Sequence, residues 1–308
     1  MKKLLIACSF ALMSTGAFAQ LTPNIGVGVG VGTTGIAIDA SATITPFLGA
    51  RFGVDIMPKI KVNKGLDLKT EDKNKQISQL TKEINDLNVQ LENAGLEKVD
   101  LNQFPDGNLP NRMDVQGKLS NTTWHILLDV YPIALSSFHI TAGAYFGPSD
   151  IVSVYNKDAG FLKPINAYND GIVYAESKPA TDNVRKVVDQ YNLKMIGAEL
   201  GDYFLTPNPA DNGDVEATVK VNSFRPYLGL GFGRAVPKGR LGCQFDLGVQ
   251  FWGKPEIYAP TYNKATGTYQ NEKLDPDNVG DDAGKVLKAI SKVSVYPVLN
   301  FRLVGRIL

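Results

Sequence analysis

The sequence predicts an all-β fold, an antiparallel up-and-down transmembrane β-barrel of eight strands with long, partly helical extracellular insertions. Three observations support this prediction. Apolar residues recur at every second position in eight segments, as they do in strands that bury one face. The connections between these segments are either very short or very long, which is typical of bacterial outer-membrane barrels. The chain also begins with the pattern of an export signal.

Residues 1–19 carry this export pattern. Lys2 and Lys3 precede the apolar stretch Leu4–Met13, and Ala17-Phe18-Ala19 places small residues at the positions that signal peptidase requires. The apolar stretch is shorter than the ~20 residues of a membrane-spanning helix. A lipobox-like Leu5–Cys8 is disfavoured, because cleavage there leaves an apolar region of only about four residues. We therefore expect a cleavable signal peptide, a mature chain from Gln20, and one barrel domain over residues 20–308.

Eight segments alternate between apolar and polar or small residues. They cover residues 25–32, 36–44, 46–62, 122–131, 138–147, 218–233, 240–252 and 293–307. In 46–62, for example, Phe52 and Val54 fall on the apolar side, while Arg51 and Asp55 fall on the other. Most segments reach the ~9–11 residues that a tilted transmembrane strand needs.

The connections predict the orientation of the barrel. Thr45–Phe47, Pro132–Ser137 and Val236–Lys238 are short, whereas the insertions of about 64–118, 148–215 and 257–291 are long. If the chain turns at Thr33-Thr34-Gly35, every remaining short turn falls on the periplasmic side and every long insertion outside. An alternative treats the glycine-rich start as one bent strand. The count is then seven, unless a further strand, best placed at Met195–Phe204, hides in 148–215.

The insertions differ in their patterns. Residues 74–94 predict a helix whose apolar stripe has 3-4-3-4 spacing and consists of Ile77, Leu80, Ile84, Leu87 and Leu91. This stripe either packs onto the insertion itself or forms a coiled-coil contact with a partner. Asp182–Tyr191 and Asp281–Ile290 are shorter helix candidates. Residues 257–282, rich in Asn, Asp, Pro and Gly, predict an irregular loop.

Charge and cysteine content exclude several function classes. Without Lys2 and Lys3 the chain has 30 Lys+Arg against 31 Asp+Glu, a balance of −1, so no basic field predicts a nucleic-acid partner. Cys243 is the only cysteine of the expected mature chain, which excludes an intramolecular disulfide and a thiolate metal cluster. The GxGxxG match at Gly30–Gly35 leads into an alternating segment rather than a helix, so it does not predict a dinucleotide site. We expect no cofactor and no metal site.

The polar faces of the predicted strands place charged residues inside the barrel. These candidate lumen residues are Arg51, Asp55, His125, Asp129, His139, Asp246, Arg302 and Arg306. Asp–His pairs serve general bases and oriented metal ligands. However, an eight-stranded barrel is just wide enough for side chains to fill it, so a structural polar network is the favoured interpretation. Because opposite charges attract across a strand pair, we expect Asp129 opposite His139; the alternative register places Tyr131 there.

Aromatic residues near the predicted strand ends or on outward faces are candidates for the girdles of a membrane barrel. They are Trp124, Tyr131, Tyr227, Phe251, Trp252, Tyr258 and Tyr296.

Four stretches, residues 32–55, 124–148, 224–255 and 295–308, carry a family resemblance. The most specific is the block PYLGLGFG…FDLGVQFWGKP. These stretches resemble a largely uncharacterised family of small bacterial outer-membrane β-barrel proteins, of the OmpA/OmpW-like barrel class. The resemblance implies the barrel and a location in the outer membrane of a Gram-negative bacterium. It implies no activity.

The favoured functional hypothesis is a barrel that anchors large surface loops for binding or adhesion-type contacts, without catalysis. Its expected partners are outer-membrane lipid and a protein or surface ligand that contacts the loops. Two alternatives remain. One is a barrel enzyme or lipid-handling protein, and the other is a pore for small solutes if the barrel has more strands.

Overall fold

The computed structural model describes residues 24–68, 70–96, 108–119, 121–133, 136–176, 182–208, 213–279 and 281–308. The predicted signal peptide of residues 1–19 and its cleavage site before Gln20 lie outside the described residues.

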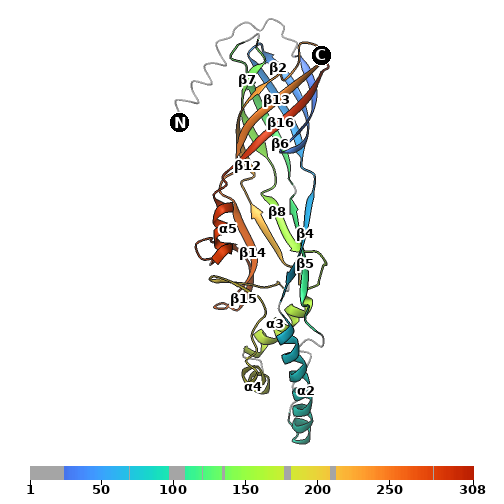
Figure 1. The fold of residues 1–308 in the computed structure, drawn as a ribbon, viewed down its shortest axis with the longest axis vertical. Coiled ribbons are helices and arrows are strands. Elements are labelled where there is room, and N and C mark those ends of the chain that lie inside the picture. Colours follow the sequence, from blue (N-terminus) through green and yellow to red (C-terminus); the bar gives the residue numbers. More distant parts are fainter. Residues whose placement is uncertain are drawn as a thin grey trace.

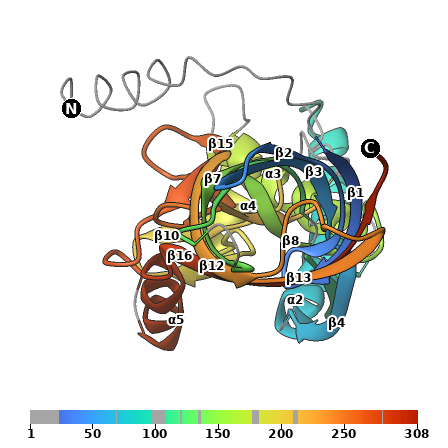
Figure 2. The same ribbon diagram turned by 90° about the horizontal axis from the view of Figure 1, so that it is seen from above.

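Eight antiparallel strands form a closed barrel, which confirms the predicted fold class (Figures 1 and 2). Around the barrel they run in the order β1-β16-β13-β12-β7-β6-β3-β2. Their bounds are β1 (Ile25–Gly32), β2 (Gly35–Thr45), β3 (Leu48–Ile56), β6 (Thr122–Val130), β7 (Phe138–Phe146), β12 (Phe224–Phe232), β13 (Leu241–Phe251) and β16 (Val295–Arg306). The pairing of β1 with β16 joins the first strand to the last, so the barrel has no open edge.

The glycine-rich start of the barrel is a hairpin rather than one bent strand. β1 pairs with β2 from Ile25 opposite Ala42 to Gly32 opposite Gly35, around the Thr33-Thr34 turn. Gly35 has a φ of +106°, and a Cβ at this position would lie 2.3 Å from the carbonyl oxygen of Ile56. Only glycine adopts this positive φ and fits this space without strain. The count of eight strands depends on this turn.

The two ends of the barrel differ, as the connection lengths predict. One end, here called the turn end, holds the short β2–β3, β6–β7 and β12–β13 connections together with the C-terminus (Figure 1). The other end, here called the module end, carries all three long insertions. We call the described residues of the insertions (57–121, 147–223 and 252–294) the extension module.

The extension module contains a second, open sheet in the order β4-β5-β8-β11-β14-β10-β9, with β15 paired to β14. The strands are β4 (Ile60–Asp67), β5 (Arg112–Leu119), β8 (Asp150–Asn156), β9 (Ala198–Leu200), β10 (Tyr203–Leu205), β11 (Glu216–Lys220), β14 (Glu256–Asn263) and β15 (Thr268–Leu274). Its first five strands follow the same order as the barrel strands β3-β6-β7-β12-β13 to which the chain joins them. The barrel wall therefore continues beyond its module end as an open sheet (Figure 1).

Three predictions for the insertions are corrected by this sheet. The segments 46–62 and 218–233 are each two strands rather than one, β3 with β4 and β11 with β12. Pro58 lies between β3 and β4, where a residue without an N–H interrupts the hydrogen-bond ladder. Residues 257–282 are not an irregular loop, because the β14–β15 hairpin pairs from Ile257–Leu274 to Asn263–Thr268. Met195–Phe204 does contain strand residues, but they belong to the second sheet.

Four helices complete the described part of the module: α2 (Glu71–Asn93), α3 (Lys163–Glu176), α4 (Asp182–Gln190) and α5 (Asp281–Ser291). The predicted helices at 74–94, 182–191 and 281–290 are confirmed, whereas α3 was not predicted. The α2 stripe packs within the chain, because Ile77, Leu80, Ile84 and Leu91 share one buried cluster with residues of α3 and α4. No helix among the described residues has both the length and the apolar character to cross a membrane.

Candidate functional site

An ion cluster around Arg51 occupies the barrel lumen. The Arg51 guanidinium donates to Asp129 Oδ1 at 2.7 Å and to Asp246 Oδ2 at 2.8 Å, although the two acids lie on β6 and β13. All three side chains are almost fully buried. Thr141 Oγ1 also donates to Asp129 at 2.7 Å. One arginine thus pairs with two carboxylates from different strands, so neither buried acid is left without a cationic partner.

Each of the two histidines is paired with a carboxylate. His125 Nδ1 lies 2.5 Å from Asp55 Oδ2, and Thr34 Oγ1 donates to the other oxygen of Asp55 at 2.8 Å. His139 Nε2 lies 2.9 Å from Asp246 Oδ1. The second contact spans two strand spacings across Gly231, where a Cβ would lie 2.4 Å from His139 Nε2. The glycine therefore leaves the space in which the His139 ring lies.

The expected opposition of Asp129 and His139 is wrong. The register of β6 with β7 places Thr141 opposite Asp129, which corresponds to the alternative with Tyr131 beside His139. The rings of Tyr131 and His139 have centroids 5.5 Å apart. Attraction between neighbouring strands does not set this contact, because the carboxylate that contacts His139 comes from β13, beyond the adjacent strand β12.

A second ion pair, between Arg302 and Asp39, completes the network. Arg302 Nε donates to Asp39 Oδ2 at 2.7 Å, and Arg302 Nη1 donates to Gln244 Oε1 at 2.8 Å. Gln244 Nε2 in turn lies 3.3 Å from Asp129 Oδ2, so the two ion clusters are connected. Sequence reasoning missed Asp39 and Gln244 as network members. The alternation of 36–44 and 240–252 places both on the inward side and could have identified them.

Among the eight predicted lumen residues, Arg306 is the one that is not buried in the lumen. Its side chain is exposed at the turn end and donates to Leu308 O, to Lys238 O and to Asn24 Oδ1. The alternation of β16 continues to this position, but the barrel interior ends before it. Two predicted girdle aromatics are also corrected, because Tyr131 and Tyr227 are buried in the lumen rather than exposed.

The lumen side chains are buried and paired mostly with one another. Asp129, His139 and Asp246 place one potential metal ligand atom each within 4.8 Å of one another. However, both carboxylates already bind Arg51, and Gln244 Nε2 lies 3.1 Å from the His139 ring nitrogen. A cation at this position would have to compete with a fixed guanidinium, so the donor set does not fit a metal ion well.

A different kind of site lies in the extension module. A cavity of about 710 Å³, here called the module pocket, is lined by residues of α2, α3, β5, β9, β10, β11 and β14 and of the segments between them. Its lining is mostly apolar and includes Met113, Leu162, Ile165, Met195, Leu205 and Ala259. The first four belong to or pack on the α2–α3–α4 core, and the last two to the core beneath α5. The pocket therefore separates two hydrophobic cores.

Lys73 of α2 is the one ionisable side chain among the described residues that line the module pocket. Partial burial and the positive charge of Lys194 together lower the pKa of Lys73 below its usual value of 10.5. The lining hydroxyls have partners within the protein. Thr70 Oγ1 donates to Pro110 O at 2.7 Å, and Thr206 Oγ1 accepts from Asn169 Nδ2 at 2.8 Å.

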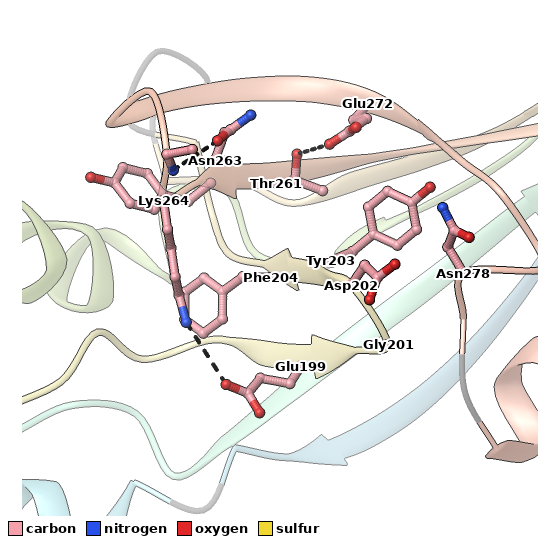
Figure 3. A pocket seen from close by; sticks show the side chains of 12 residues that line it. Glu199, Gly201, Asp202, Tyr203, Phe204, Thr261, Asn263, Lys264, Glu272 and Asn278 are labelled. Atoms are coloured by element: carbon pink, nitrogen blue, oxygen red, sulfur yellow. Dashed lines mark hydrogen bonds and ion pairs between the residues drawn. The ribbon is translucent and has the colours of Figure 1, made fainter.

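A second cleft, of about 520 Å³, lies against β9, β10, β14 and β15 and is more polar (Figure 3). Most of its charged groups have partners within the protein. Lys264 Nζ lies 3.8 Å from Glu199 Oε1, and Thr261 Oγ1 donates to Glu272 Oε2 at 3.1 Å (Figure 3). Lys264 also lies over the ring of Phe204, 4.8 Å from its centroid. These contacts already engage the cation and two of the carboxylates that line the cleft.

Comparisons with known proteins give structural neighbours but no family. No family model matches the chain, and no curated protein matches it. Among solved structures, CarO from Acinetobacter baumannii is 13% identical with a TM-score of 0.39, covering 94% of this chain and 99% of that one. CarO2 from the same species is 15% identical with a TM-score of 0.40 and coverages of 94% and 100%. A major outer membrane protein from Thermus thermophilus is 11% identical with a TM-score of 0.36 and coverages of 93% and 100%. Values this low assign neither a family nor an activity.

Proposed function

We propose that the chain is a bacterial outer-membrane protein whose barrel spans the membrane and whose extension module binds a ligand or partner outside the cell. The barrel exterior supports the membrane location. Large apolar side chains point outward on its strands and stay about half exposed, among them Phe52 at 52%, Leu247 at 57% and Leu303 at 56%. An apolar belt around a whole barrel is costly in water and is the surface that lipid chains solvate.

Aromatic residues at both ends of the barrel fit the same location. Trp124, Phe146, Phe224 and Phe251 lie on the exterior near the module end, and Phe47, Phe138 and Phe232 lie near the turn end. Trp252 Nε1 donates to Val293 O at 2.7 Å, so this ring keeps its polar group bonded beside the belt. Aromatic girdles at the two membrane interfaces are usual in such barrels. Short turns usually face the periplasm, so the module end faces outward.

The observation that carries the binding function is the contrast between the two parts of the chain. The lumen is filled by paired side chains, whereas the module has two cores of its own and a cavity between them. A filled eight-stranded lumen leaves no room for a water channel or a substrate. We therefore assign the contacts of this protein with other molecules to the module, as binding or adhesion-type contacts without catalysis.

Cysteine labelling of intact cells tests the location and the orientation. In a Cys243→Ser background, Lys82→Cys on α2 should react with a membrane-impermeant maleimide. The matched variant Lys238→Cys, exposed at the turn end, should react only after the cells are opened. The reverse pattern would invert the orientation, and recovery of the chain in the soluble periplasmic fraction would end the membrane proposal.

Conductance measurements test the role of the lumen. Because the ion network fills the barrel, we expect the full chain to form no stable channel in a planar bilayer. Steady single-channel conductance would contradict this expectation and support transport of small solutes as the function. Hydrolysis of lipid or peptide substrates by the purified chain would instead favour an enzyme.

A further inference from the structure

We propose that the module pocket binds an amphipathic anion, a molecule with an apolar body that ends in one carboxylate or phosphate monoester group. This inference rests on the proposed function, since it names the ligand class of the surface module.

The apolar lining determines the body of the ligand. The cavity of about 710 Å³ falls within the ~300–1,000 Å³ that is typical of small-molecule sites, which are mostly apolar with a few polar groups. Met113, Leu162 and Ile165 of the lining belong to one core, and Leu205 and Ala259 belong to or pack on the other. Well-packed proteins seldom leave apolar gaps of this size between two cores, because the wall atoms lose their packing contacts. An apolar occupant would restore these contacts.

The charges at the pocket determine the other end of the ligand. Lys73 lines the pocket, and Lys194 is close enough for its charge to act on Lys73. The ammonium group of Lys73 on an otherwise apolar lining attracts an anionic group, and the nearby charge of Lys194 adds to the positive potential there. The lining hydroxyls of Thr70 and Thr206 already bond within the protein, so Lys73 is left as the polar recognition element. An anionic head at Lys73 with an apolar tail toward Leu205 satisfies both features.

The same chemistry, an apolar tail with an anionic head, has two sources. A free fatty acid supplies a carboxylate head, and a lipid headgroup supplies a phosphate. Dodecanoate and dodecyl phosphate are suitable probes because they share a tail and differ only in the head. Dodecan-1-ol has the same tail without a charge, so it isolates the contribution of the apolar lining.

The test uses the full chain in lipid nanodiscs and radiolabelled probes, with binding to empty nanodiscs subtracted. We expect saturable binding of one dodecanoate or dodecyl phosphate per chain, and the tighter of the two identifies the head group. Lys73→Met should weaken binding about tenfold, Lys73→Arg should restore it, and dodecan-1-ol should not distinguish these variants. Ala198→Trp, which adds a large ring at an exposed lining position, should abolish binding of all three probes. Lys82→Met, on the same helix but outside the pocket, should bind like the unmodified chain.

Absence of saturable binding, or binding that ignores both Ala198→Trp and Lys73→Met, would overturn the proposal. Binding that is unaffected by both substitutions would place the probes on the barrel exterior. This outcome is distinct from failure of the proposed function. If Lys82→Cys stays unlabelled on intact cells while dodecanoate still binds, the location is wrong and the pocket assignment stands.

Discussion

At the scale of single residues, the lumen depends on carboxylates that each have more than one partner. Asp129 accepts from Arg51, Thr141 and Gln244, and Asp246 binds both Arg51 and His139. Removing one acid leaves several buried donors without an acceptor, which costs more than the loss of a single hydrogen bond.

Asp129→Ala should therefore lower the free energy of unfolding of the barrel by about 3 kcal/mol, the lower end for a broken buried pair because Arg51 keeps Asp246. Denaturant titration of the detergent-solubilised chain measures this change. The control is Asp150→Ala, which removes a half-exposed partner of Lys220 and should change the free energy by less than about 1 kcal/mol. Equal effects of the two variants would contradict a structural role for the network.

The lowered pKa of Lys73 predicts the pH dependence of ligand binding. An ammonium group binds an anion only below its pKa, and burial together with Lys194 lowers the pKa of Lys73 from 10.5. Dodecanoate affinity should thus be constant at neutral pH and fall as the pH rises, with the fall beginning below pH 10.5. Lys73→Arg should remove this fall, because arginine stays protonated. If the dodecanoate affinity of the unmodified chain and of Lys73→Arg falls in parallel, the cause is alkaline unfolding instead.

At the scale of elements, α2 shows how packing selects between two interpretations of one pattern. Its narrow apolar stripe fits either a partner helix or the module itself. In the structure Leu80 and Ile84 are each 1% exposed and pack in the core that includes Tyr168 and Ile172 of α3. The stripe is thus already covered within the chain, which leaves the outer face of α2 for solvent.

Leu80→Ala should lower the free energy of opening of the module by about 2–5 kcal/mol, because it leaves a cavity in this core. Hydrogen exchange of α2 and α3 amides measures the change, while the barrel amides should keep their protection. Val89→Ala is the matched control, since Val89 lies on the same helix and is 59% exposed. Loss of barrel protection in Leu80→Ala would show that the two parts unfold together.

At the scale of the whole molecule, the closed sheet of the barrel continues into the open sheet of the extension module. Every barrel strand pairs on both sides, whereas the module sheet has free edges at β4 and β9 and is covered in part by helices (Figure 1). Backbone hydrogen bonds of a closed barrel cannot open one strand at a time from an edge. The barrel should therefore unfold at a higher urea concentration than the module.

Unfolding in urea should accordingly occur in two transitions. Protease cleavage in the module should appear at lower urea than the loss of the compact, heat-modifiable form of the barrel on gels. The order follows from the free edges of the module sheet, from which strands can open one at a time. A single coincident transition for both readouts would contradict this independence.

The alternation of the sequence was enough to predict the eight barrel strands, the long-insertion end and the inward side of Arg51, Asp55 and Asp246. These features are local, because a strand shows its two faces with a period of two residues. The same rule fails at Arg306, where the alternation continues beyond the end of the lumen. It also misses the break at Pro58, where a strand leaves the barrel and continues in the second sheet.

The sequence by itself therefore determined three features: the barrel, the side chains that face its lumen, and the end that carries the long insertions. Only the tertiary structure decided which lumen charges meet, that α2 packs within the chain, and that a pocket separates the two module cores. Arg51 and Asp246 are 195 positions apart, and their contact depends on closure of the barrel and on the register of every strand between them. Period and turn chemistry act over a few residues, whereas a cross-barrel ion pair or a gap between two cores exists only when distant segments have taken their places.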